Sequence, residues 1–403
     1  MGSPPPEQED QGDVAARSGH CVLRGDRTVS ALAALITRAQ ATHSDAVVVR
    51  RHNAVIAAWS SAPTATPILT MSCTKSIVSL AIGTLLDDGH LPSIDQPVSE
   101  IYPEWRQGNK QRITLRHLLN HTSGVQDHPS AGVELEPSPD WIQLALAAEL
   151  SEMPGEHFRY NNKAVNLLAG IVQRVVHQRL DIYLQERLFA PLGITDVAWV
   201  YDHVGTPYVA GGLSLVADDL ATLGQVILNR GLWAGQRILS KEWIDLSVAQ
   251  GQPYYPLYGL LWWRIPAYEY VTITAATFAA LQDAALAAAT LRALEPLVEQ
   301  RLASAPAYRQ ALAQALGPDW QAVLADASRR GVEMATWDRG TIIGYQANGY
   351  LGQYLVILPA ADIVAVRMVR RTPTYDPATD GFEDFPTYVQ ALGREEMGET
   401  VGS

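Results

Sequence analysis

Apolar residues lie in strand-like runs near both ends of the chain and recur at helical spacing between them. Residues 46–59 are predicted to form two strands joined by a turn at Arg51, His52 and Asn53. Further strands are predicted near the C-terminus, at residues 340–347, 353–358 and 363–368. Short amphipathic helices separated by Pro and Gly are predicted between them, for example at residues 76–89, 114–120 and 165–172. The pattern predicts an α+β fold, in which helices flank one antiparallel sheet assembled from both chain ends.

The same pattern divides the chain into parts. Residues 1–20 are predicted to be a disordered leader, and residues 91–204 an inserted, all-helical lobe. Residues 21–90 and 205–403 would together form the α/β lobe. Within that lobe, an alanine-rich helical insertion is expected at about 268–335, with breaks at Pro306 and Pro318. We interpret it as a peripheral insertion; the alternative is a lid or a wall of the substrate site.

Composition narrows the classes of protein that the chain can represent. The 403 residues are 47% hydrophobic and 18% charged, which is typical of a globular protein. A net charge of −12 argues against nucleic-acid binding. No apolar run is long enough to span a membrane, and the leader lacks the apolar core of a signal peptide, so we expect a soluble, cytoplasmic protein. Cys21 and Cys73 are the only cysteines, so a disulfide framework is not expected, and Cys73 is interpreted as a packing residue.

Ser72 and Lys75 are the strongest candidates for chemistry. The chain has four lysines, and only Lys75 has a serine three residues before it. Because residues three apart share one face of a helix, the Lys75 amine can reach the Ser72 hydroxyl. Ser72 would lie in the first turn, where the helix dipole favours negative charge on oxygen. A buried lysine with a lowered pKa can accept the serine proton, whereas a chance match would not place a cation in an apolar helix.

Tyr160 and Asn162 form a second candidate pair, in a turn-rich segment before the helix predicted at 165–172. A tyrosine beside a lysine ammonium is expected to have a lowered pKa and to relay protons. The Asn162 amide could orient the lysine or bind a substrate carbonyl. In the structural alternative, Asn161 or Asn162 caps the helix that follows. Both interpretations can hold together.

These residues give the chain a clear resemblance to a known superfamily. It resembles the serine β-lactamases and penicillin-binding proteins, in the branch with class C β-lactamases, D-alanyl-D-alanine carboxypeptidases, family VIII carboxylesterases and 6-aminohexanoate-dimer hydrolase. The resemblance covers about residues 45–265 and 338–370. Besides the two motifs, it rests on Pro154 and Gly155 and on framework segments at residues 113–124, 189–193 and 211–220.

The resemblance implies a β-lactamase/transpeptidase-like fold and a role for each motif residue. Ser72 would be the acylated nucleophile, Lys75 its base, and Tyr160 the proton shuttle to the leaving group. Asn162 would bind the acyl side of the substrate or hold Lys75. The third family motif, normally Lys-Thr-Gly or a His-containing variant, corresponds to residues 347–353, which hold neither Lys nor His.

The missing cation bears on substrate and oxyanion binding. In β-lactam and peptide members that cation binds the substrate carboxylate, so its absence near Asn348 argues against such substrates. The strand still offers backbone donors, and the N–H groups of Ser72 and Tyr350 would form the oxyanion hole, with Gly349 and Leu351 as neighbouring positions.

The sequence therefore predicts a serine hydrolase that acts through an acyl-enzyme on a small ester or amide, or an acyltransferase. The alternatives are a β-lactamase or D-Ala-D-Ala carboxypeptidase, and a catalytically silent binding protein. His121 is interpreted as a structural histidine rather than part of a triad. No metal or cofactor is expected, since no His, Cys or Asp cluster has ligand spacing. Residues 254–263 would pack the sheet; the alternative is that they line an acyl pocket.

Overall fold

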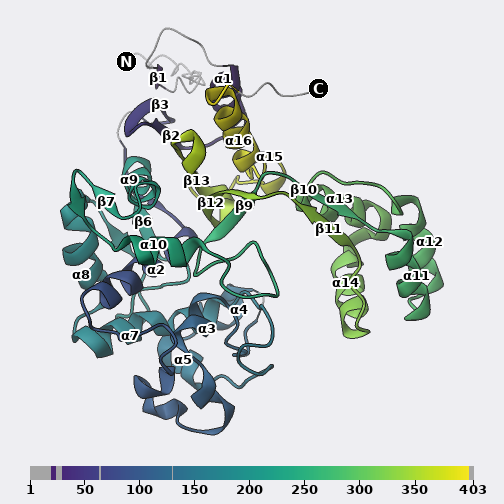
Figure 1. Cartoon of the computed structure of the whole chain (residues 1–403), viewed down its shortest axis with the longest axis horizontal. Coiled ribbons are helices and arrows are strands. Elements are labelled where there is room, and N and C mark those ends of the chain that lie inside the picture. Colours follow the sequence, from purple (N-terminus) through teal and green to yellow (C-terminus); the bar gives the residue numbers. More distant parts are fainter. Residues whose placement is uncertain (1–19, 24–29, 63–64, 129, 399–403) are drawn as a thin grey trace, which may run out of the picture.

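A seven-stranded antiparallel sheet lies in the upper part of the molecule as drawn in Figure 1, with most of the helices below it. The computed structural model describes residues 20–23, 30–62, 65–128 and 130–398. The predicted leader, residues 1–20, lies outside the described residues except for His20, where the first strand begins. In spatial order the strands are β1 (His20–Leu23), β3 (Ala54–Ser60), β2 (Ala46–Arg51), β14 (Ile363–Met368), β13 (Gln353–Leu358), β12 (Ile342–Gly349) and β9 (Trp263–Pro266). The predicted α+β fold, with a sheet assembled from both chain ends, is confirmed.

Local sequence explains the strands. His52 and Asn53 join β2 to β3 with φ values of 50° and 58°, the left-handed pair that a tight two-residue hairpin requires. All residues of β13 and β14 are buried, as expected for central strands that read as continuous apolar runs.

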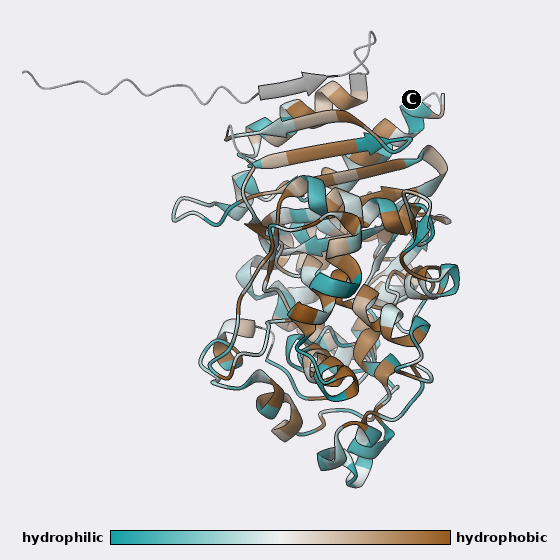
Figure 2. Cartoon of the chain, turned by 90° about the vertical axis from the view of Figure 1, so that its left-hand side faces the viewer, coloured by the Kyte–Doolittle hydropathy of each residue, from teal (hydrophilic) through white to brown (hydrophobic). Residues whose placement is uncertain are grey.

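Helices cover both faces of the sheet. One face packs against α2 (Cys73–Asp87) and α9 (Ala217–Leu228), and its core extends into the helical lobe. The other face packs against α1 (Ser30–Ala41) and α16 (Phe385–Glu396). Brown hydrophobic stretches run along the strands between these layers (Figure 2). Because α2 joins the sheet to the lobe, it is buried from Cys73 to Leu85.

Short helices dominate the chain between α2 and β5, where the helical lobe was predicted. They are α3 (Leu115–Leu119), α4 (Ala131–Glu134), α5 (Trp141–Ala147), α6 (Asn162–Val165), α7 (Leu167–Val176) and α8 (Leu180–Leu184). Two small sheets are separate from the main one: β4 (Ile68–Leu69) pairs with β6 (Leu213–Leu215) and β6 with β5 (Ala198–Trp199), while β7 (Leu232–Trp233) pairs with β8 (Gln236–Arg237). Because β5 lies within residues 91–204, the predicted lobe is not entirely helical. Two further helices are α10 (Lys241–Val248) and α15 (Pro377–Asp380).

The alanine-rich segment projects from the end of the sheet on a two-stranded ribbon (Figure 1). The ribbon is β10 (Glu269–Thr272) paired with β11 (Thr336–Arg339). Four helices follow β10: α11 (Ala275–Asp283), α12 (Ala288–Leu294), α13 (Ala305–Leu316) and α14 (Trp320–Arg329). They enclose a hydrophobic cluster of their own, separate from both cores of the sheet. None of the described helices has the length and apolar character needed to span a bilayer.

Candidate active site

Ser72 lies at the amino end of α2, where β4 and Met71 lead the chain into the helix. Met71 has a left-handed φ of 50°, and Ser72 occupies the N-cap position. Lys75, one turn later, donates a hydrogen bond from Nζ to Ser72 Oγ at 3.0 Å. Its second bond goes to the carbonyl oxygen of Ala210 at 2.6 Å. The helix thus brings the two residues together at the spacing that the sequence predicted.

Burial favours the neutral form of the Lys75 amine. The side chain is 1% exposed, and this desolvation lowers the pKa of Lys75 to about 7, against a smaller opposing effect of the Asp127 carboxylate. A substantial share of the amine is therefore neutral at neutral pH. A neutral amine 3.0 Å from a serine hydroxyl can accept its proton.

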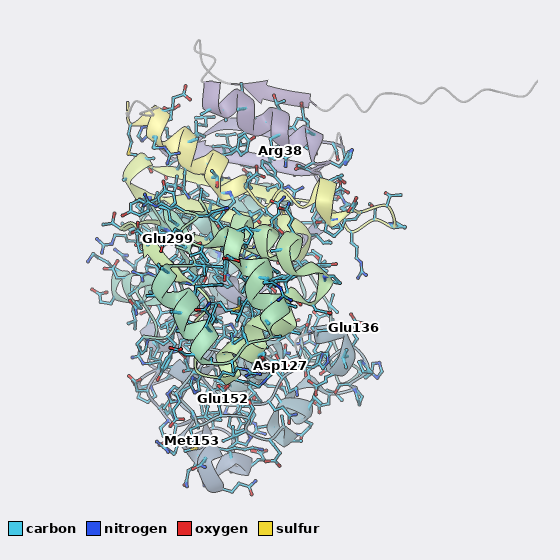
Figure 3. All side chains as sticks on the ribbon, turned by 90° about the vertical axis from the view of Figure 1, so that its right-hand side faces the viewer. Arg38, Asp127, Glu136, Glu152, Met153 and Glu299 are labelled. Carbon is cyan, nitrogen blue, oxygen red and sulfur yellow. The ribbon has the colours of Figure 1, made fainter. Side chains whose placement is uncertain are left out.

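The Asp127 carboxylate raises the pKa of Lys75 against the larger lowering by burial, so its charge should affect the pH range of the predicted base. It belongs to the helical lobe, on the face that looks toward the alanine-rich insertion (Figure 3). Asp127→Asn keeps an acceptor oxygen but removes the negative charge that favours the ammonium. The pKa of Lys75 should fall from about 7 to a lower value, so the rising limb of the kcat/KM–pH profile should move to lower pH.

The matched control for this prediction is Asp95→Asn. Asp95 is an exposed carboxylate paired with Arg116, and it is not among the groups that shift the pKa of Lys75. Its profile should coincide with that of the wild type. A limb that stays in place in Asp127→Asn, or moves to higher pH, would contradict the assignment of Lys75 as the base.

Tyr160 is held beside Lys75 by its neighbours. Asn161 caps α6 by accepting a hydrogen bond from the Ala164 N–H at 2.6 Å, so the capping interpretation holds for Asn161. The Lys75 amine lies 4.9 Å from the centre of the Tyr160 ring. Trp263 stacks on the Tyr160 ring, with ring centres 6.0 Å apart. The aromatic segment at residues 254–263 thus packs against Tyr160 as well as the sheet.

The expected lowering of the Tyr160 pKa is wrong. Burial raises the pKa of Tyr160 well above its ordinary value, although a hydrogen bond with Ser72 opposes the rise. No cation is among the groups that shift the pKa of Tyr160, so the effect of desolvation dominates. Environments that push two pKa values apart assign one group as base and the other as acid. The Tyr160 hydroxyl is therefore protonated at neutral pH, which fits the prediction that Lys75 is the base.

His121 is a buried structural histidine, as interpreted from the sequence. Its Nδ1 accepts a hydrogen bond from the Asn161 N–H at 3.1 Å, and its ring centre lies 4.4 Å from that of Tyr160. Burial, assisted by Lys75, lowers the pKa of His121 well below its usual value. The neutral ring supports the segment that carries Tyr160.

Asn162 is not a partner of Lys75. Among the described residues, the Lys75 amine hydrogen-bonds to Ser72 and Ala210, whereas the Asn162 N–H donates to the Asp127 carboxylate at 2.7 Å. The suggested role of Asn162 in holding Lys75 is therefore absent from this structure, and a role in substrate binding stays a prediction.

The sequence interpretation missed Asn166, which is fully buried. Its side chain accepts a hydrogen bond from the Ala210 N–H at 3.2 Å and donates to the Asn162 carbonyl at 2.9 Å. Asn166 therefore orients the Ala210 peptide, whose carbonyl holds the lysine. The sequence signal that could have identified Asn166 is its polar side chain inside the apolar helix predicted at residues 165–172.

The end of β12 passes directly beside Ser72. A Cβ atom at Gly349 would lie 3.0 Å from the Ser72 nitrogen and 2.6 Å from the Thr70 carbonyl, so only glycine fits here. Tyr350 follows with a side chain that is 64% exposed. Leu351 is buried, and its carbonyl faces away toward Arg367. The use of the Ser72 and Tyr350 N–H groups as an oxyanion hole stays a prediction, which this close approach supports.

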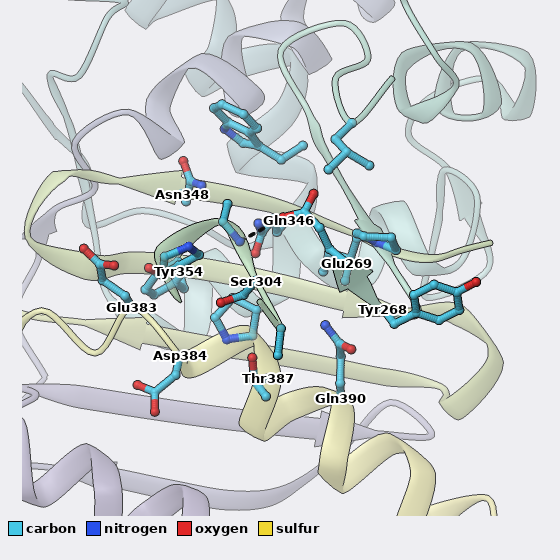
Figure 4. A pocket seen from close by; sticks show the side chains of 18 of the residues that line it. Tyr268, Glu269, Ser304, Gln346, Asn348, Tyr354, Glu383, Asp384, Thr387 and Gln390 are labelled. Carbon is cyan, nitrogen blue, oxygen red and sulfur yellow. Dashed lines mark hydrogen bonds between the residues drawn. The ribbon is translucent and has the colours of Figure 1, made fainter. Parts of the chain in front are cut away.

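A cavity of about 1120 Å³ lies on the opposite face of β12, between α16 and the insertion. Asn348, Gln346 and Tyr354 project into it from the sheet, and Thr387 and Gln390 from α16 (Figure 4). Ser72, Lys75 and Tyr160 do not line it, although Trp263 contacts both the cavity and Tyr160. Within the described residues, no group of three His, Cys, Asp or Glu side chains is placed to hold a metal ion.

The β-lactamase family model matches residues 29–384, and the chain therefore belongs to the β-lactamase family. This confirms the resemblance drawn from Ser72, Lys75, Tyr160 and the framework segments. The family is one of serine hydrolases, with relatives named for amide and ester hydrolysis.

Individual relatives place the chain within this family. It is 30% identical over 250 residues to the 6-aminohexanoate-dimer hydrolase of Paenarthrobacter ureafaciens, covering 57% of this chain and 63% of that protein. Esterase EstB of Burkholderia gladioli is 32% identical over 148 residues, which cover 32% of this chain and 37% of the esterase. The matches thus span less than two thirds of either relative. The crystal structure of a penicillin-binding protein from Bacillus halodurans shares the fold, with a TM-score of 0.58, 16% identity, and coverage of 89% of this chain and 98% of that one.

Proposed function

We propose that this protein hydrolyses a small ester or amide by transferring its acyl group to Ser72 and then to water. One observation carries the proposal: the buried Lys75 amine, with a pKa of about 7, lies 3.0 Å from the Ser72 hydroxyl. That pairing turns a weak nucleophile into a reactive one without a histidine. The relatives named for hydrolysis of an amide dimer and of esters support the same reaction class.

In the acylation step, Ser72 Oγ attacks the carbonyl carbon and its proton passes to Lys75 Nζ. Negative charge develops on the carbonyl oxygen, where the N–H groups of Ser72 and Tyr350 stabilise it. The bond to the leaving group then breaks, and the leaving oxygen or nitrogen takes the Tyr160 proton. The Lys75 ammonium returns a proton to Tyr160, which restores both groups. Water releases the acid from Ser72 by the same steps, and an alcohol or amine in place of water would make the protein an acyltransferase.

Substrate preference follows from the third motif. Residues 347–353 carry no lysine or histidine, and Ala347 is buried against the core shared with α2. A substrate carboxylate would therefore find no cation on this strand. We expect kcat/KM for p-nitrophenyl acetate to be at least about tenfold higher than for a chromogenic cephalosporin. The factor corresponds to the free energy of about one hydrogen bond to a charged group, which the cephalosporin carboxylate would not make here. Spectrophotometric assays of both measure this.

The β-lactamase or D-Ala-D-Ala carboxypeptidase alternative makes the opposite prediction. Rapid cephalosporin turnover, lost in Ser72→Ala, would favour that alternative and set aside the ester or amide assignment. Release of D-alanine from a D-Ala-D-Ala peptide would do the same. With either result, Ser72 would still be assigned as the nucleophile.

A covalent probe separates the enzyme from a silent binding protein of the same fold. A fluorophosphonate should label the wild-type chain, and peptide mass spectrometry should place the adduct on Ser72. Ser72→Ala is the control and should stay unlabelled. No label on the folded wild-type protein, together with no acyl-enzyme mass shift after ester addition, would refute the proposed function.

A further inference from the structure

Arg367 on β14 is fully buried and makes an extensive set of hydrogen bonds that neither the mechanism nor the sequence motifs explain. Every nitrogen of its guanidinium has an acceptor. These are Ser44 Oγ at 2.8 Å and the backbone carbonyls of Leu351 (3.1 Å), Gly352 (2.8 Å), Gly381 (3.2 Å), Thr42 (3.0 Å) and Asp380 (2.6 Å). None of these acceptors is a carboxylate.

Burying the Arg367 guanidinium costs free energy, so we ask which part of the structure its hydrogen bonds hold in place. Burial lowers the pKa of Arg367 to about 10, which shows that its charge is disfavoured here. Apolar residues of similar volume often replace buried charges without loss of stability. The geometric property that sets Arg367 apart is that one planar group holds carbonyls from several segments at once.

Two of those carbonyls belong to the connection between β12 and β13, which consists of Tyr350, Leu351 and Gly352. Leu351 has a φ of 70° and Gly352 a φ of 81°, so two consecutive residues are left-handed. For Leu351 this conformation costs about 1–2 kcal/mol, and an unsupported connection would tend to relax. Hydrogen bonds from Arg367 to both carbonyls hold it in place.

The ends of the same connection are fixed from the opposite side, by α2. Gly349 packs against the Ser72 nitrogen, and the Gln353 carbonyl accepts a hydrogen bond from Cys73 Sγ at 3.6 Å. Arg367 contacts the middle of the connection, at the carbonyls of Leu351 and Gly352. Between these contacts lies Tyr350, whose N–H is the second oxyanion donor in the proposed reaction.

We propose that Arg367 is a positioning residue of the oxyanion hole, which keeps the Tyr350 N–H aligned with the Ser72 N–H by fixing the connection from β12 to β13. The inference rests on the proposed function, because it assigns a support to the donor used there. Arg367 touches no substrate. It acts through the carbonyls of Leu351 and Gly352.

The first test compares Arg367→Lys with Arg50→Lys. A lysine keeps the charge, but its single nitrogen cannot serve the same carbonyls. Arg50 is also a buried arginine, 7% exposed, but it bonds to Asp218 at 2.7 Å, away from the connection. Arg367→Lys should lower kcat for p-nitrophenyl acetate about 10- to 100-fold, less than the loss of a complete oxyanion donor. KM should change little, and affinity for a small alkyl boronic acid, which forms a tetrahedral adduct on serine, should fall in parallel.

A second pair perturbs the same junction without removing the arginine. A Cβ atom at Gly352 would lie 2.1 Å from the Gly381 carbonyl oxygen and 2.3 Å from Arg367 Nη1, so Gly352→Ala must displace the guanidinium, the Gly381 carbonyl that it binds, or both. Gly89→Ala is the matched control, because Gly89 has a similar φ of 74° but open space around its Cβ position. Gly352→Ala should reproduce the loss of kcat and of boronic-acid affinity, and Gly89→Ala should not.

The outcomes separate this inference from the proposed function. An active wild type with normal kcat and boronic-acid affinity in folded Arg367→Lys would overturn the role of Arg367 and leave the hydrolase intact. Equal losses in Arg367→Lys and Arg50→Lys would likewise reduce it to a structural residue. If Arg367→Lys does not fold, Gly352→Ala decides by the same two measurements. A wild type without any acyl-enzyme would instead refute the proposed function itself.

Discussion

Replacing Lys75 with alanine is expected to lower the acylation rate by about 10³- to 10⁴-fold, the upper range for loss of a general base. The amine is the group positioned to take the Ser72 proton, and its pKa of about 7 leaves it able to do so at neutral pH. Both esters and amides should be affected alike, because the loss precedes the departure of the leaving group. Stopped-flow measurement of p-nitrophenol release gives the rate.

Two further variants test this assignment. Lys75→Met fills the same volume without an amine and should be as inactive as Lys75→Ala, which separates chemistry from packing. A small primary amine added to Lys75→Ala should restore part of the rate by entering the vacated space. Lys241→Ala removes an exposed lysine and should behave as the wild type. Activity in Lys75→Met close to that of the wild type would show that Lys75 is not the base.

Replacing Tyr160 with phenylalanine should produce a loss that depends on the leaving group. The Tyr160 ring contacts the rings of His121 and Trp263, and phenylalanine keeps these contacts, so Tyr160→Phe should fold normally and lose only the hydroxyl. An amide nitrogen must be protonated before it leaves, and a p-nitrophenolate oxygen need not be. We therefore expect kcat to fall about 10²- to 10⁴-fold for a p-nitroanilide and substantially less for p-nitrophenyl acetate.

The comparison of the two substrates decides the role of Tyr160. Equal losses of kcat on both substrates would show that Tyr160 acts in the attack of Ser72 and not in the protonation of the leaving group. Near-normal rates on both would remove it from the mechanism. Because burial raises the pKa of Tyr160, the variant should also keep the rising limb near pH 7 that Lys75 sets.

Local sequence predicted the parts of this structure that local geometry controls. The spacing of Ser72 and Lys75 needs only one turn of helix, and the structure has that hydrogen bond at 3.0 Å. The turn at His52 and Asn53 likewise follows from two residues that tolerate left-handed backbone. The apolar runs at residues 353–358 and 363–368 predicted strands, and the structure places both, fully buried, inside the sheet as β13 and β14.

Properties that depend on residues distant in sequence were predicted less well. The pKa of Tyr160 depends on burial produced by packing against Trp263 and Tyr258, about a hundred residues away along the chain. Lys75 is held by a backbone carbonyl at Ala210, and a carbonyl carries no sequence signal. Arg367 has no motif either, since its partners are mostly main-chain oxygens. In each case the missing information is tertiary.

The alanine-rich insertion leaves and rejoins the sheet at one place, where the Ala267 N–H donates to the Thr341 carbonyl at 2.8 Å. With its own hydrophobic cluster, it needs no apolar contact with the cores of the sheet to fold. The alanine-rich insertion can therefore become longer or shorter, or be replaced by another segment, without a change in the register of β9 against β12. A relative without the insertion would need only one deletion, and we expect the positions of Ser72 and Lys75 relative to the sheet to stay the same.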